Sequence, residues 1–184
     1  FLDIKCRAAG LRPSAVVIVA TVRALKMHGG LLKEELKEEN LQALEQGLPN
    51  LLRHVSNIRN VYGLPAVVAG NRFPTDTDAE IALVIRKCRE LGVNTVLSDV
   101  WAKGGEGGEE LAREVVRLCE EENAFRFCYD EKAPVKEKIE RIVTRIYGGK
   151  DVAYTPDAEE EIARLSALGF GQLPVCMAKT QYSF

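Results

Sequence analysis

Residues 15–30 read AVVIVATVRALKMHGG, and the first seven of them decide the fold class. An apolar, largely β-branched run without polar alternation is typical of a parallel strand that helices cover on both faces. Similar short runs occur at Ala66–Gly70, Thr95–Ser98 and Leu173–Ala178, with a weaker one at Phe125–Tyr129. Because longer stretches of helical spacing separate these runs, the sequence predicts an α/β fold, with an internal parallel sheet flanked by helices.

The helices are predicted from apolar spacing and from capping residues. Thr77–Glu80 reads as a capping box, in which a hydroxyl and a carboxylate each accept a backbone N–H, and this helix is expected to end at Gly92. The other predicted helices are Asn40–Val61, Glu109–Asn123, Val135–Tyr147 and one that begins at Thr155–Pro156.

We expect a core portion over residues 1–130 that binds nucleotide or folate. Residues 131–184 are expected to form a helical appendage that returns to a final strand. Because the chain starts at Phe1 and stops at Phe184 after an apolar segment, we expect it to be an internal piece of a longer protein.

Composition excludes several classes of function. The 184 residues carry 25 Lys and Arg against 27 Asp and Glu, a net charge of −2, which argues against a nucleic-acid-binding surface. No apolar run reaches the roughly 18 residues that a membrane span needs. The five cysteines show no CxxC spacing, so we expect reduced thiols and no metal site. No charged and then apolar signal peptide opens the sequence, so we expect a cytoplasmic protein.

In an open parallel sheet, ligands bind beyond the carboxyl ends of the strands. The residues that follow the predicted strands are therefore the candidates for chemistry, and we expect them to converge on one edge. These stretches are Thr21–Gly30, Asn71–Thr77, Ser98–Gly108 and Lys179–Tyr182.

Two pairs of side chains stand out at this edge. Arg23 and Lys26 place two cations after the first strand, which suits a phosphate or a carboxylate, although solvated charges would look the same. Phe73 and Trp101 follow two different strands, beside Pro and Gly residues. Two facing rings would form a slot for a flat heterocycle, whereas the alternative is that they pack beneath their loops.

The glycine-rich stretch Gly104–Gly108 invites comparison with a phosphate-binding loop. It matches neither GxGxxG nor GxxxxGK[ST], and no Walker A motif occurs in the 184 residues. Glu106, Glu109 and Glu110 would repel a phosphate, so we favour a flexible turn followed by a helix with an acidic first turn.

Several long motifs resemble the formate–tetrahydrofolate ligase family, in the order in which that family has them. Val19–Gly30 is similar to the family's signature, and the resemblance extends from one end of the chain to the other. The further matching stretches are Asp3–Arg7 with Gly10–Leu11, Asn71–Thr77, Trp101–Gly108, Gly169–Gly171 and Leu173–Phe184.

The resemblance implies ATP-dependent ligation of formate to tetrahydrofolate, which gives 10-formyltetrahydrofolate, ADP and phosphate through formyl phosphate. It implies a P-loop NTPase-like core, ATP with magnesium and tetrahydrofolate as substrates, stimulation by a monovalent cation, and a homotetramer. The glycine-rich ATP loop of the family would lie upstream of these residues, so the fragment alone is expected to be inactive and its catalytic residues stay unknown.

The resemblance also implies roles for individual residues. Phe73 and Trp101 match the aromatic pair of the folate pocket, with Leu97 and Pro74 beside them. From its place in the same loop, we expect Asp76 to contact the pterin edge or to order the loop. Residues expected near the nucleotide or phosphates are Thr21, Arg23, Lys26 and Asn71.

Two alternatives remain. Asn71 after a strand resembles the start of an NKxD guanine-reading loop, which would make the chain the base-binding half of another P-loop NTPase, but Pro74 stands where the acid belongs. The other alternative is a folate- or nucleotide-binding module without catalysis.

Overall fold

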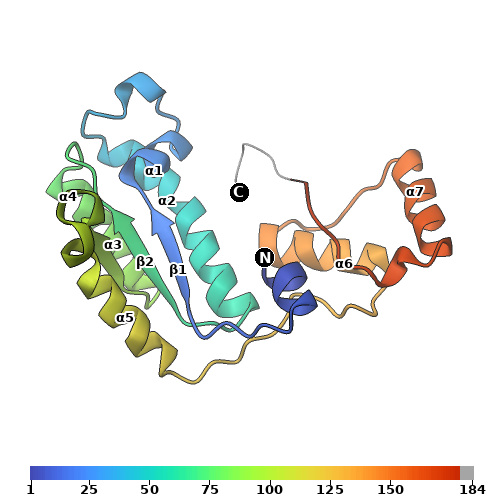
Figure 1. Cartoon of the computed structure of the whole chain (residues 1–184). Helices are drawn as coiled ribbons and strands as arrows, with labels where there is room; N and C mark the ends of the chain where they lie inside the picture. The colour runs from blue at the N-terminus through green and yellow to red at the C-terminus, as the bar shows by residue number, and fades with distance from the viewer. Residues whose placement is uncertain (179–184) are drawn as a thin grey trace. The chain divides into compact units, whose positions relative to one another are not determined.

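The computed structural model of the chain describes residues 1–178, and in these residues the strands form one parallel sheet (Figure 1). β1 (Val16–Ala20) pairs with β2 (Ala66–Asn71), which pairs with β3 (Thr95–Ser98). The register of β2 and β3 places Asn71 opposite Ser98, so both strands end at the same edge. The parallel α/β class and these three strands are confirmed.

Helices connect and follow the strands, and three of their starts are capped, two of them (Thr77 and Thr155) as predicted. The side chains of Asn40, Thr77 and Thr155 each accept a backbone N–H three residues further along. The α-helices are α1 (Val22–His28), α2 (Leu41–Ser56), α3 (Asp78–Glu90), α4 (Val100–Lys103), α5 (Glu109–Cys119), α6 (Val135–Ile142) and α7 (Pro156–Ala167). The shorter helical turns are η1 (Leu2–Cys6), η2 (Lys33–Glu35), η3 (Asn57–Val61), η4 (Gly104–Gly108), η5 (Val143–Tyr147) and η6 (Phe170–Gln172).

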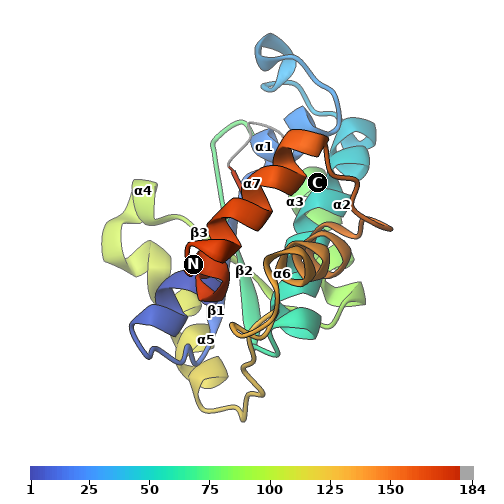
Figure 2. The same ribbon diagram turned by 90° about the vertical axis from the view of Figure 1, so that its right-hand side faces the viewer.

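Helices pack on both faces of the sheet, as Figures 1 and 2 show. On one face, Val68 of β2 joins a core built from α1, α2 and α3; on the other, Val67 joins Val96 and Leu118 of α5. The prediction of a wholly internal sheet holds for β2 but is wrong for β1, where Val17 and Val19 are exposed. β1 is an edge strand, and α5 packs against β2 and β3 instead.

Two glycines let α1 and α2 approach each other closely. A Cβ atom on Gly29 would lie 1.8 Å from the carbonyl oxygen of Ala43, and one on Gly47 would lie 1.8 Å from that of Leu25. Neither position has room for a side chain. This contact fixes the segment that follows β1, and with it one wall of the candidate site.

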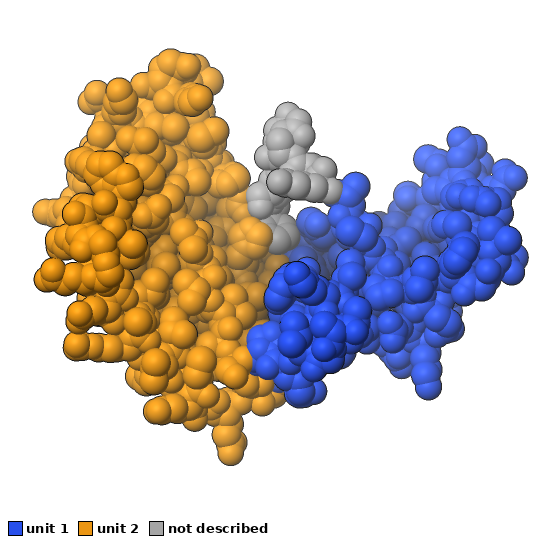
Figure 3. Space-filling model, in the orientation of Figure 1, with its two compact units in different colours: residues 1–13, 125–184 blue, residues 14–124 orange. Residues whose placement is uncertain are grey.

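The chain divides into two compact units, coloured separately in Figure 3. The sheet unit is Ser14–Ala124, and the second unit is Phe1–Pro13 with Phe125–Phe184. The predicted domain ranges 1–130 and 131–184 and the P-loop NTPase-like core stay predictions. No helix within the described part of the chain is long and apolar enough to cross a membrane.

The two strands expected in the second unit are absent from the described residues 125–129 and 173–178. Side chains occupy the backbone groups that a strand ladder would use. Over 125–129, the N–H of Cys128 donates to Asp3, and Arg7 donates to the carbonyl of Tyr129. Near 173, Lys138 donates to the carbonyls of Gly171 and Leu173, and the N–H of Val175 donates to the Tyr129 hydroxyl.

All five cysteines are free thiols, as expected. Cys6, Cys88 and Cys128 are buried, whereas Cys119 and Cys176 are exposed. Burial is the largest influence on the Cys88 thiol and raises its pKa, which is typical of a packing residue without redox chemistry.

Candidate functional site

A pocket opens at the carboxyl ends of β1, β2 and β3, where a ligand site was expected. Its cavity volume is only about 20 Å³, and the rest of the depression is open to solvent. Thr21, Asn71, Asp76 and Leu97 line it, so four of the predicted site residues come together here. Its floor is apolar and comes from α1, α3 and the strand ends.

The loop between β2 and α3 is held by its own hydrogen bonds. The N–H of Phe73 donates to Oδ2 of Asp76 at 2.9 Å, and the N–H of Asp76 donates to the carbonyl of Phe73 at 3.0 Å. Asp76 is buried, and burial raises the pKa of its carboxyl although the Phe73 N–H acts in the opposite direction. These two hydrogen bonds close the loop between Phe73 and Asp76. The role expected for Asp76, at the pterin edge or in ordering the loop, stays a prediction.

The predicted capping box at Thr77 forms, and the carboxylate of Glu80 in it also forms an ion pair with Lys26. Oε2 of Glu80 accepts the N–H of Thr77 at 3.1 Å, while Oε1 contacts Nζ of Lys26 at 2.8 Å. Oε1 also accepts the N–H of Asn40, and Lys26 donates to the carbonyl of Glu38. Both charged side chains are essentially inaccessible to solvent, so this pair ties α1, α2 and α3 together.

The pKa of Glu80 follows from these contacts. Burial, the largest influence, would raise it, but the ammonium of Lys26 and the N–H groups of Thr77 and Asn40 together lower it below the ordinary value. The carboxylate is thus charged when the protein is folded. Lys26 was expected near the phosphates, but its ammonium group forms this internal ion pair with Glu80.

Arg23 reaches the loop after β2. Its guanidinium carbon is 4.5 Å from the centroid of the Phe73 ring, and one terminal nitrogen donates to Oγ1 of Thr75 at 3.2 Å. Thr21, in contrast, is the N-cap of α1 and accepts the N–H of Ala24. The two cations that looked equivalent in sequence therefore have different neighbours.

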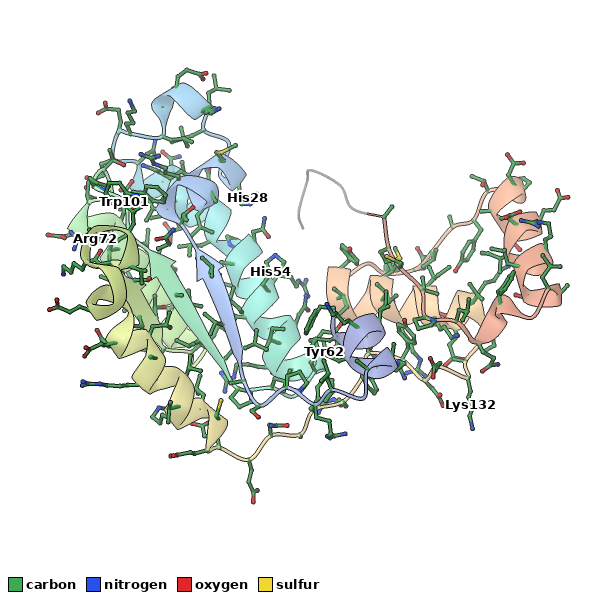
Figure 4. All side chains as sticks on the ribbon, in the orientation of Figure 1. His28, His54, Tyr62, Arg72, Trp101 and Lys132 are labelled. Atoms are coloured by element: carbon green, nitrogen blue, oxygen red, sulfur yellow. The ribbon has the colours of Figure 1, made fainter. Side chains whose placement is uncertain are left out.

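Trp101 lies in α4, directly after β3, and the residue is 86% exposed. Figure 4 shows Trp101 and Arg72 at the end of the sheet where the strands terminate. The alternative that Trp101 packs beneath its loop is wrong. Phe73 is half-buried and Pro74 is exposed. Phe73 and Trp101 thus follow hydrogen-bonded neighbouring strands, with the Trp101 ring open to a ligand.

The glycine-rich stretch Gly104–Gly108 forms the short helical turn η4. Asp99 donates its N–H to the carbonyl of Gly107 at 3.1 Å, and a Cβ atom on Gly107 would lie 2.5 Å from the backbone of Asp99. Glu109 and Glu110 occupy the first turn of α5, as expected. This glycine therefore serves close backbone packing beside Trp101.

Sequence reasoning missed Thr75 as a partner of Arg23 and the pairing of Glu80 with Lys26. Lys26 lies on the same helix face as the apolar residues Val22 and Leu25, and that position indicates a buried cation. No nearby residue in the sequence identifies its partner on α3. Among residues 1–178, no group of three or more His, Cys, Asp or Glu residues is placed to hold a metal ion.

The comparison with protein families bears on what this edge of the sheet does. The family model of formate–tetrahydrofolate ligase matches residues 1–184, which is the whole of the chain. The match includes each strand end and each loop described above. The chain therefore belongs to the formate–tetrahydrofolate ligase family, whose members are ligases of one-carbon folate metabolism with ATP and tetrahydrofolate as substrates.

Proposed function

We propose that this chain provides the tetrahydrofolate-binding part of a formate–tetrahydrofolate ligase. One observation carries the proposal: Phe73 and Trp101 follow adjacent strands at the edge where open α/β sheets bind ligands, and Trp101 is 86% exposed. A large exposed aromatic ring next to an ordered loop has no role in the core. It can stack on a flat heterocycle such as a pterin.

In this proposal, the pterin lies between the rings of Phe73 and Trp101. Leu97, which lines the pocket, and the exposed Pro74 provide apolar contacts beside it. The bond from the Phe73 N–H to Asp76 supports a role for that carboxylate in holding the Phe73 wall. Stacking on one ring contributes on the order of 1 kcal/mol beyond the apolar area it buries.

The reaction of the whole enzyme places an acyl phosphate close to this slot. Phosphoryl transfer from ATP to formate gives formyl phosphate and ADP. The N10 amine of the folate then attacks the formyl carbon, the C–N bond forms, the C–O bond to phosphate breaks, and N10 loses its proton. We assign Thr21, Arg23 and Asn71 to the vicinity of the phosphates because they lie at the same edge as Phe73.

Lys26 has a different role in this proposal: its buried ion pair with Glu80 stabilises the end of the sheet where the ligand binds.

The chain contains no GxxxxGK[ST] motif, so we assign the binding of ATP with magnesium, and any monovalent cation, to residues outside this sequence. A homotetrameric ligase in the cytoplasm is the assembly and location that we propose for the whole enzyme.

Isothermal titration of the 184-residue chain with tetrahydrofolate tests the proposal. We expect saturable binding that weakens in both Phe73→Ala and Trp101→Ala. Titrations with ADP and GDP cover the nucleotide-binding alternatives. Binding of GDP without binding of tetrahydrofolate would contradict the proposal and favour the base-binding interpretation.

A coupled ADP-release assay separates binding from catalysis. With ATP, formate and tetrahydrofolate present, we expect the chain alone to bind the folate without releasing ADP. Release of ADP that depends on both formate and folate would show that these 184 residues carry the phosphoryl-transfer site as well, and would overturn this division of roles.

A further inference from the structure

We infer that Arg23 is a positioning residue that fixes the ring of Phe73 for its ligand. The guanidinium carbon lies 4.5 Å from the ring centroid, within the range of a cation–π contact. One face of Phe73 is thus in contact with the cation, which leaves the other face for the pterin. The inference rests on the proposed function because it presumes that Phe73 contacts folate.

A second contact extends this hold to the loop itself. A terminal nitrogen of Arg23 donates to Oγ1 of Thr75, so Arg23 binds the loop on both sides of Pro74. The internal bonds between Phe73 and Asp76 close the loop from within. Arg23 belongs to α1, whose place against α2 is set by the close approach at Gly29 and Gly47. The ring is therefore fixed to a rigid element.

The Nε atom of Arg23 supports an orientation that serves the ring. Within residues 1–178, Nε of Arg23 is buried and has no hydrogen-bond partner. A buried N–H without an acceptor costs free energy, and such groups are rare in native proteins. An arginine placed only for stability would pair this group. Here the guanidinium lies over Phe73 and leaves Nε unpaired, as expected if the position of the ring is what matters.

The effect on binding follows from the cost of ordering a side chain. A ring held in one orientation before the ligand arrives loses less conformational freedom on binding. Removal of the guanidinium frees the Phe73 ring and the Thr75 loop in the unbound protein. Folate affinity then falls even though no contact to the ligand is lost.

A double-mutant cycle on the 184-residue chain tests this inference, with tetrahydrofolate affinity measured by titration. We expect Arg23→Met to weaken binding by about 5- to 30-fold in the wild-type background. In the Phe73→Ala background, the same change should cost less than about twofold, because its effect passes through the ring. Arg23→Lys keeps the charge but loses the planar group, so it should not restore affinity.

Arg86→Met is the matched control, because Arg86 is exposed on α3 and its removal changes the net charge by the same amount. We expect it to change folate affinity by less than about twofold. A spectroscopic readout complements the cycle: with 4-fluorophenylalanine at position 73, Arg23→Met should shift the ¹⁹F resonance before any ligand is added. Urea unfolding of each variant confirms that it is folded.

The outcomes separate the inference from the proposed function. Equal losses for Arg23→Met in both backgrounds would show that Arg23 contacts the ligand directly and would overturn the inference. Unchanged affinity in Arg23→Met, together with a loss in Phe73→Ala, would overturn the inference alone. Unchanged affinity in Phe73→Ala would contradict the proposed function itself.

Discussion

The loops that follow β2 and β3 carry the two aromatic residues of the candidate slot, and they are built differently. The loop around Phe73 is held by Asp76, by Arg23 through Thr75, and by the Thr77–Glu80 capping box. Trp101 lies on a four-residue helix, and the residue is 86% exposed. The Phe73 side of the slot, here called the fixed wall, is therefore held before the ligand arrives. The Trp101 side, the open wall, gains most of its burial from the ligand.

This comparison separates stability from binding. A change in the support of the fixed wall should lower the free energy of unfolding and folate affinity together. A change in the open wall should lower folate affinity alone.

The largest effect is expected for the buried pair beneath the fixed wall. Lys26→Met leaves the Glu80 carboxylate buried without its cation, so it should lower the free energy of unfolding by about 3 to 5 kcal/mol. Urea denaturation measures the loss. Lys87→Met is the control, because it breaks a partly exposed pair with Glu45 and should cost less than about 1 kcal/mol. Equal losses in the two variants would contradict the role of the buried pair.

The next effect distinguishes the two rings. Trp101→Ala should weaken tetrahydrofolate binding by roughly 1 to 3 kcal/mol through lost stacking and burial. Its free energy of unfolding should stay within about 0.5 kcal/mol of the wild-type value, because the ring is exposed. Phe73→Ala should weaken binding and also lower stability, by about 1 kcal/mol or more, since it removes the contact with Arg23. Unchanged folate affinity in Trp101→Ala would contradict the proposal that Trp101 contacts the folate.

A smaller effect is expected from the helix cap at the end of the fixed loop. Thr77→Ala removes the hydroxyl that accepts the N–H of Glu80, so it should cost about 1 kcal/mol of stability and weaken folate binding slightly. Thr155→Ala removes the equivalent cap of α7 and should cost a similar amount, with no change in folate affinity. A drop in folate affinity in Thr155→Ala would show that folate binding follows overall stability, and would contradict a local effect of the Thr77 cap.

The smallest effect is a pair of opposite pH dependences. The folded-state pKa of Glu80 lies below the ordinary value of 4.5, so its stabilisation is present above that pH and is lost as the pH falls through the lowered pKa. The folded-state pKa of Asp76 lies above the ordinary 3.8, so stability falls as the pH rises through the interval between the two values.

Melting temperatures measured from roughly pH 3 to pH 7 test these signs. Glu80→Gln should remove part of the loss on acidification. Asp76→Asn should remove part of the decline with rising pH and keep an oxygen that can accept the Phe73 N–H. Identical pH profiles for the two variants and the wild type would contradict both assignments.

Local signals in the sequence were enough to predict the three strands of the parallel sheet. The strands β1, β2 and β3 come from short runs rich in apolar and β-branched residues, and the cap at Thr77 is a four-residue pattern. The rule that ligands bind beyond the strand ends then brought Phe73 and Trp101 to one edge. Each of these predictions depends on residues close together in sequence or on a general property of parallel sheets.

The parts that the sequence did not predict depend on distant residues. The apolar runs 125–129 and 173–178 have strand composition, but a strand also needs a partner, and side chains such as Lys138 bind their backbone instead. Arg23 and Lys26 look alike in sequence, yet one lies over Phe73 and the other pairs with Glu80. Such choices follow from the packing of α1 against α2 and α3.

The central claim is that tetrahydrofolate binds against Trp101, and this residue is the single tryptophan of the chain. Its emission can be measured with acrylamide as quencher, with and without saturating tetrahydrofolate, and with N-acetyltryptophanamide as the control for light absorbed by the folate. We predict that the folate protects Trp101 from acrylamide in the wild type and that Phe73→Ala needs a higher folate concentration for the same protection. Saturable folate binding that leaves the acrylamide quenching of Trp101 unchanged would contradict the account.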